Sequence, residues 1–132
     1  MFTCVAMILG VSLTELPALA LNVEAEARTL TAQADVTPAF LSQIEQFSGD
    51  SERLSVALRQ AGVEQDLPCI FHGIGQDALE RAAEFRAADT DAERTEAFTN
   101  LRVLLDDAIL IAPMAASAAA DRAVAQDVAA AN

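Results

Sequence analysis

The sequence predicts an all-α protein: a small antiparallel helical bundle of about four core helices with an alanine-rich C-terminal helix, preceded by an apolar N-terminal segment. Apolar residues recur at intervals of three, four and seven from residue 40 onward, as they do on one face of an α-helix. These stretches are separated by sequences typical of helix starts, Thr-Pro and Asp-x-Pro, and by single glycines typical of helix ends. We find no stretch with the alternating pattern of a β-strand.

The predicted bundle covers residues 37–112, and short connections favour antiparallel neighbours. Thr37 is expected to cap the first helix, with Pro38 at its first position, and Gly49 to stop it. The second helix is expected to begin at Asp50 or Ser51 and to end at Gly62, where a left-handed residue is favourable.

The third helix is expected to start at Asp66 and Pro68, and the fourth at Asp89 or Thr90. Pro113 should kink or end the fourth helix, so residues 113–132 are expected to be a separate alanine-rich helix or tail. Seven large residues share the predicted inward faces and should form the centre of the core: Phe40, Ile44, Phe71, Phe85, Phe98, Leu101 and Leu105.

The N-terminus resembles a targeting signal. The apolar run of residues 2–13 is too short to span a bilayer alone, which takes roughly 20 residues. The stretch 16–20 suits a signal-peptidase site after Ala20, and a second candidate site follows Ala34. No arginine precedes Arg28, so the usual basic start of a signal peptide is missing.

Three interpretations of this segment stay open. In the first, residues 1–20 are a signal peptide, residues 21–36 are a linker, and the protein is periplasmic or secreted. In the second, residues 2–21 are an uncleaved membrane anchor. In the third, the segment is a first core helix, and a cytoplasmic location also stays open.

The net charge of −12 disfavours binding to nucleic acid and to anionic membrane surfaces. It leaves room for a protein partner or self-association, and it also favours simple solubility. We expect no stable membrane span in the mature chain.

Cys69 and His72 are the candidate catalytic residues. They lie one turn apart on the predicted third helix, so their side chains should be neighbours. Pro68 places Cys69 in the first helical turn, where the helix dipole and an adjacent imidazolium favour a thiolate. The competing interpretation is a cysteine that acts as a small buried apolar residue.

The sequence predicts no cofactor and no metal. Gly73, Gly75 and Ala78 match a dinucleotide-binding pattern, but no second strand follows to complete the fold that this pattern needs. Spacings typical of zinc ligands and of di-iron bundles are absent. An acidic stripe of Asp77, Glu80 and Glu84 has no loop to wrap around a cation.

Val103 and Leu110 are the candidate interaction residues. They project from the polar face of the fourth helix, one heptad apart, and are expected to contact either a partner or the alanine-rich tail. The leading hypothesis is a non-catalytic, exported helical protein that acts through protein–protein contact. The alternative is a thiol-dependent activity centred on Cys69 and His72.

Overall fold

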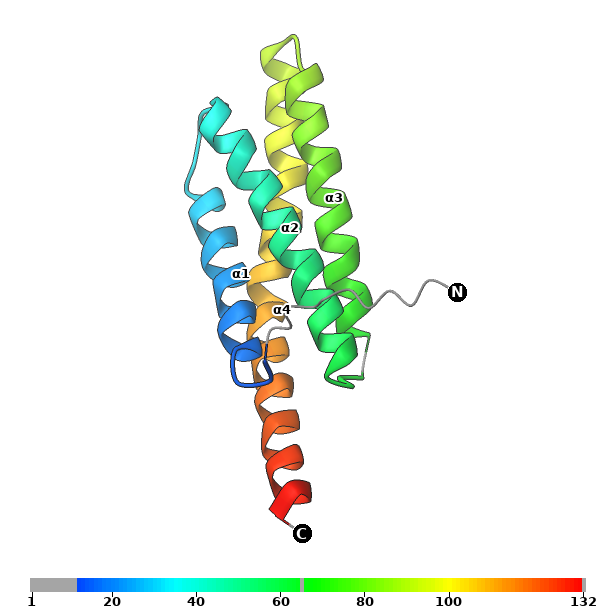
Figure 1. The fold of residues 1–132 in the computed structure, drawn as a ribbon. Helices are drawn as coiled ribbons and strands as arrows, with labels where there is room; N and C mark the ends of the chain where they lie inside the picture. The colour runs from blue at the N-terminus through cyan, green and yellow to red at the C-terminus, as the bar shows by residue number, and fades with distance from the viewer. Residues whose placement is uncertain (1–11, 65, 132) are drawn as a thin grey trace, which may run out of the picture.

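The computed structural model describes residues 12–64 and 66–131, and in these ranges the chain forms four α-helices and no β-strand. The helices are α1 (Leu16–Thr31), α2 (Pro38–Gln60), α3 (Leu67–Ala87) and α4 (Asp91–Ala131). They lie alongside one another, and the C-terminal part of α4 extends past the ends of the other three (Figure 1). The prediction of an all-α helical bundle is confirmed.

The helices are arranged as two main pairs. α2 packs most extensively against α3, and α1 packs most extensively against α4, while α1 also contacts α2 and α3 contacts α4. The first and last helices of the chain are therefore direct neighbours, although the whole α2–α3 hairpin separates them in sequence.

Local capping explains where α2 begins and ends. The Thr37 side chain accepts a hydrogen bond of 3.0 Å from the Phe40 N–H, and Pro38 follows it, as predicted. At the other end Gly62 is left-handed, with a φ of 74°. The Val63 N–H bonds to the Leu58 carbonyl and the Gly62 N–H bonds to the Arg59 carbonyl, which is a Schellman motif.

The last two helices begin in different ways. Asp66 is left-handed, with a φ of 62°, and makes no side-chain capping bond, so α3 starts after a turn rather than after an N-cap carboxylate. Before α4, the Thr90 hydroxyl accepts from the Glu93 N–H (3.1 Å), and the Glu93 carboxylate accepts from the Asp89 N–H (2.8 Å). These two bonds satisfy two backbone N–H donors at the helix start, in a variant of the capping box.

Two predicted breaks do not occur. Gly49 lies inside α2 and Pro113 lies inside α4, so five predicted helices become three. A glycine within a helix costs only about 1 kcal/mol, and buried residues flank Gly49 on both sides. A proline costs about 3 kcal/mol, and Pro113 sits among the buried alanines 108, 112, 115 and 119, whose packing continues across it.

The expected linker of residues 21–36 was also wrong for most of its length, because residues 21–31 belong to α1. Six residues of α1 are buried at spacings of one, three and four: Leu16, Leu19, Ala20, Val23, Ala27 and Leu30. The helical period was overlooked because two of the six are alanines and polar residues separate them. Residues 1–11, which contain most of the predicted signal peptide, lie outside the described residues.

The predicted core is largely confirmed. Six of its seven residues are buried, and Phe98 is partly buried against them. The rings of Phe40, Phe85 and Phe98 bring together α2, α3 and α4, with centroids 4.8–5.6 Å apart. Aromatic groups at such distances attract one another beyond the effect of burial alone.

Candidate functional site

Cys69 and His72 lie one turn apart on α3, and both side chains are exposed. Because α3 begins at Leu67, Cys69 is in the first helical turn, as the sequence predicted. Phe71 and Ile74 turn to the buried side of the same helix. Cys69 is therefore not a buried apolar residue.

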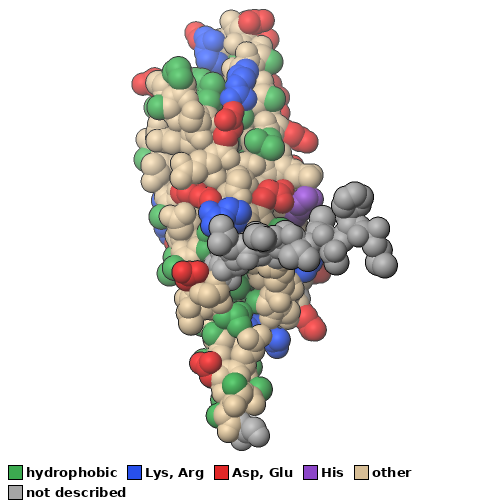
Figure 2. Space-filling view, in the orientation of Figure 1, with side chains coloured by type: hydrophobic (Ala, Val, Ile, Leu, Met, Phe, Trp, Pro, Cys, Tyr) green, Lys and Arg blue, Asp and Glu red, His purple; other side chains and the backbone are tan. Residues whose placement is uncertain are grey.

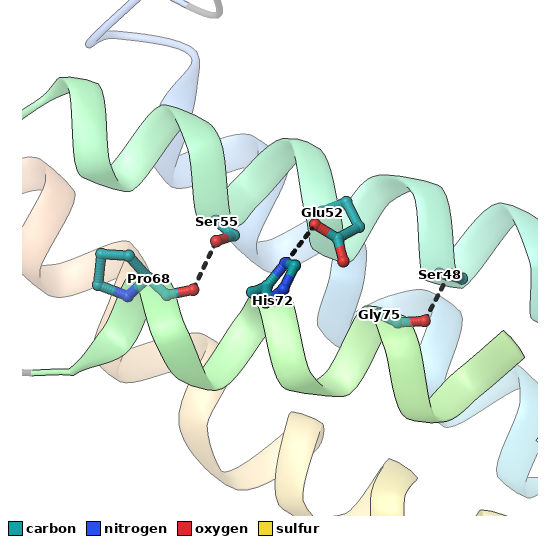
Figure 3. Close-up of polar contacts among 6 residues, drawn as sticks. All are labelled: Ser48, Glu52, Ser55, Pro68, His72 and Gly75. Atoms are coloured by element: carbon teal, nitrogen blue, oxygen red, sulfur yellow. Dashed lines mark hydrogen bonds and ion pairs between the residues drawn. The ribbon is translucent and has the colours of Figure 1, made fainter. Parts of the chain in front are cut away.

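His72 makes its contact with α2 rather than with Cys69. Its Nδ1 atom lies 2.8 Å from Oε2 of Glu52, and both side chains are partly open to solvent (Figure 3). Within the described part of the chain no hydrogen bond joins Cys69 to His72. Glu52 was not predicted, because it precedes His72 by 20 residues and belongs to a different helix.

Two buried hydrogen bonds flank this ion pair and fix the register between α2 and α3. The Ser48 hydroxyl donates to the Gly75 carbonyl at 2.6 Å, and the Ser55 hydroxyl donates to the Pro68 carbonyl at 2.5 Å (Figure 3). The serines are seven residues apart on one helix, and their acceptors are seven apart on the other. The two bonds therefore hold α2 and α3 in the register in which Glu52 meets His72.

The same geometry explains the glycine pattern at residues 73–78. Gly73 and Gly75 lie within α3, and Gly75 is buried where α3 approaches α2. A dinucleotide site needs these glycines in a turn between a strand and a helix. Here Gly75 serves helix packing instead.

The thiol and the imidazole lie on an open surface. Four shallow clefts of about 220–560 Å³ occur elsewhere on the described surface, and Cys69 and His72 line none of these four. Residues 12–64 and 66–131 contain no group of three or more histidine, cysteine or acidic side chains positioned to hold a metal ion.

Val103 and Leu110 are 61% and 71% exposed. The expected contact with the alanine-rich tail is wrong, because residues 113–131 continue α4 without a break and do not fold back. Three further large apolar residues are exposed on the same face of α4. We call these five residues the outer stripe, and at 100° per residue they fall within an arc of about 80°: Val103, Leu110, Met114, Val124 and Val128.

The outer stripe lies opposite the buried face of α4, which carries the alanines 108, 112, 115 and 119. Separate hydrophobic side chains are visible along the protruding part of α4, with a few charged groups among them (Figure 2). Only Val103 and Leu110 were predicted from the sequence, because the other three residues of the stripe follow Pro113, where the helix was expected to break.

α4 also contains a window of 18 residues with a mean hydropathy of 1.6, of which 33% is buried in the bundle. By length and composition alone this helix could cross a membrane. Core helices of soluble proteins meet the same criteria, so this single helix is weak evidence for a membrane protein.

An acidic pair lies between α1 and α2. Oε2 of Glu26 is buried without a hydrogen-bond partner among the described residues. Asp50 is also buried, and its Oδ1 atom forms an ion pair with Nη1 of Arg53 at 3.1 Å. Burial is the main cause that raises the pKa of Glu26 to about 8, and the neighbouring Asp50 carboxylate adds to it. Asn22 and Arg53 act in the opposite direction.

Cys69 and His72 thus form an exposed pair with Glu52 behind the imidazole, and α4 carries a second candidate site that is apolar. Comparison with protein-family models, with curated proteins and with solved structures gives no match for this chain.

Proposed function

We propose that this protein is non-catalytic and acts by contact with another protein chain through the outer stripe of α4. The observation that carries the proposal is the row of five exposed large apolar side chains on one face of the only described helix that extends past the bundle. Single exposed apolar residues are normal. A row that continues for about seven helical turns is typical of a surface that a partner covers.

Export is the second part of the proposal, supported by the small residues that precede the candidate site after Ala20. We favour this site over the one after Ala34. Cleavage after Ala34 would remove all of α1, including the buried Val23, Ala27 and Leu30, whereas cleavage after Ala20 leaves these three in place.

Site-specific photocross-linking in the producing cell tests the contact. A photoreactive side chain at Leu110 should give a discrete cross-linked product, because this position is in the outer stripe. The matched control is Leu79, an apolar residue of α3 that is 51% exposed and lies outside the stripe. Products from Leu79 but not from Leu110, or from neither position, would contradict the proposal.

A thiol-dependent activity is the second candidate function. It is favoured by the exposure of Cys69 in the first turn of α3 and by Glu52, which engages Nδ1 of His72 and leaves Nε2 of that ring without this partner. A carboxylate that holds a histidine in this way fixes the orientation of the ring.

Labelling with iodoacetamide at neutral pH distinguishes the two functions. A Cys4→Ser background makes Cys69 the only thiol, and a short unfolded cysteine peptide provides the reference rate. Thiol activity requires labelling faster than the reference, with a decrease in both His72→Ala and Glu52→Gln. A rate equal to the reference and unchanged in both variants would leave only the contact function.

A further inference from the structure

Four residues of the outer stripe are arranged symmetrically along α4. Leu110 and Met114 precede Ala119 by nine and five residues, and Val124 and Val128 follow it by five and nine. Ser117 and Asp121 lie two residues before and after the same point, on the same outward face. On this outward face, between positions 110 and 128, apolar and polar residues therefore follow the same order in both directions from Ala119.

This symmetry is what a two-fold contact between identical helices requires. In such a contact residue i meets residue j of the other copy, and j meets i in return. When two α4 helices run antiparallel and cross at Ala119, Leu110 meets Val128 of the second copy and Met114 meets its Val124. Ser117 then meets Asp121 of the second copy, where the hydroxyl can donate to the carboxylate.

The spacing also has the period of a helix–helix seam. The six positions 110, 114, 117, 121, 124 and 128 are separated by four, three, four, three and four residues. This alternation is the heptad pattern of a coiled coil, in which a polar residue within the seam fixes the register at some loss of stability.

We infer that the chain that covers the outer stripe is a second copy of this protein, joined through an antiparallel pair of α4 helices centred on Ala119. This inference rests on the contact function proposed above and names its partner. Each protruding end, residues 120–131, would lie along residues 107–118 of the other copy, so the part of α4 that extends past its own bundle is covered.

The bundles themselves permit this arrangement. The buried face of α4, which includes Ala112 and Ala119, points into its own bundle and away from the stripe. The two bundles would therefore lie on opposite sides of the helix pair and would not collide. The charge of −12 on each copy opposes association, so the dimer should strengthen as added salt screens the repulsion.

Val103 distinguishes this arrangement from a general apolar contact. It belongs to the outer stripe and is 61% exposed, but it lies 16 residues before Ala119, outside the six paired positions from 110 to 128. A charge at Val103 should therefore leave the dimer intact, whereas a charge at Met114 or Val124 should break it.

Sedimentation velocity across a range of concentrations tests the inference on the chain as isolated from the producing cell. We expect a dimer for the parent chain and for Val103→Lys. We expect monomers for Met114→Lys and for Val124→Glu at the same concentration, with circular dichroism confirming that both are folded. An equimolar mixture of Met114→Lys and Val124→Glu should dimerise again. In the mixed dimer the new lysine meets the new glutamate at one contact, and the unchanged Met114 and Val124 meet at the other.

A parent chain that stays monomeric at every concentration and salt level would overturn the inference. So would a mixture that fails to recover, or a Val103→Lys variant that dissociates as completely as the other two. A further outcome separates the two proposals. If the parent chain is monomeric and Leu110 cross-links to a protein of different mass, the contact function stands and only the pairing of two copies is ruled out.

Discussion

Ser48 in α2 and Gly75 in α3 meet through their backbones as well as through the serine hydroxyl. A Cβ atom built on Gly75 would lie 3.0 Å from the Ser48 carbonyl oxygen and 2.9 Å from Cγ of Glu52. The Glu52 side chain can move aside, but the carbonyl belongs to a helix backbone whose neighbours are buried. Glycine therefore allows the close approach in which the Ser48–Gly75 hydrogen bond forms.

Gly75→Ala is expected to lower the free energy of unfolding by about 1–3 kcal/mol, because the crowded contact outweighs the better helix propensity of alanine. Gly49→Ala is the matched control, since a Cβ there meets no described atom within 4 Å. It should raise stability by about 0.5–1 kcal/mol. Urea denaturation of the two variants measures both effects, and equal effects of the same sign would contradict the close-approach explanation.

Glu26 should make stability depend on pH. Its pKa of about 8 in the folded chain lies above its ordinary value of 4.5, so between these values the folded chain holds a proton that the unfolded chain has lost. The stabilisation from this proton is complete below the ordinary pKa and is lost as the pH rises through about 8. The parent chain should therefore lose stability relative to Glu26→Gln as the pH rises. Denaturation of both from about pH 5 to about pH 9 tests this, and a constant difference between them would contradict it.

Phe40 and Phe98 should differ in their contributions to the core. Phe40 is fully buried and contacts two other rings, so Phe40→Ala should cost about 3–5 kcal/mol of unfolding free energy. Phe98 is partly buried, with the Arg102 guanidinium 5.8 Å from its ring centre, so Phe98→Ala should cost less. A larger loss for Phe98→Ala than for Phe40→Ala would contradict the described packing.

The position of the mature N-terminus has a measurable effect on the core. A chain that begins at Leu21 lacks Leu16 and Leu19, which are buried in the longer chain. Each buried leucine contributes about 1.5–3 kcal/mol, so this chain should be clearly less stable than one that begins at Ser12. Thermal unfolding of the two chains provides the comparison. Equal stability would contradict the described packing of Leu16 and Leu19.

Predictions based on local capping succeeded where capping decides the structure, as at Thr37, Gly62 and Thr90. They failed at Gly49 and Pro113, because buried neighbours on both sides outweigh the local preference of a single residue. α1 was missed because alanine contributes little to an apolar pattern read from sequence, although Ala20 and Ala27 are fully buried.

In the candidate site, too, local features could be predicted from the sequence, whereas contacts between helices could not. The exposed position of Cys69 and His72 on one helix followed from the helical period alone. The contact between His72 and Glu52 could not be predicted without the register between α2 and α3. Only two of the five residues of the outer stripe could be predicted. The other three, and with them the symmetry of the stripe, follow from the continuity of α4 through Pro113.

The pairing of α1 with α4 determines when the fold can be completed. α2 and α3 are adjacent in sequence and can pair as soon as both have been synthesised, but α1 must wait for the last helix of the chain. Until translation reaches α4, the apolar face of α1 remains without its main partner. The export proposed above would use this interval, in which α1 of the nascent chain still lacks α4.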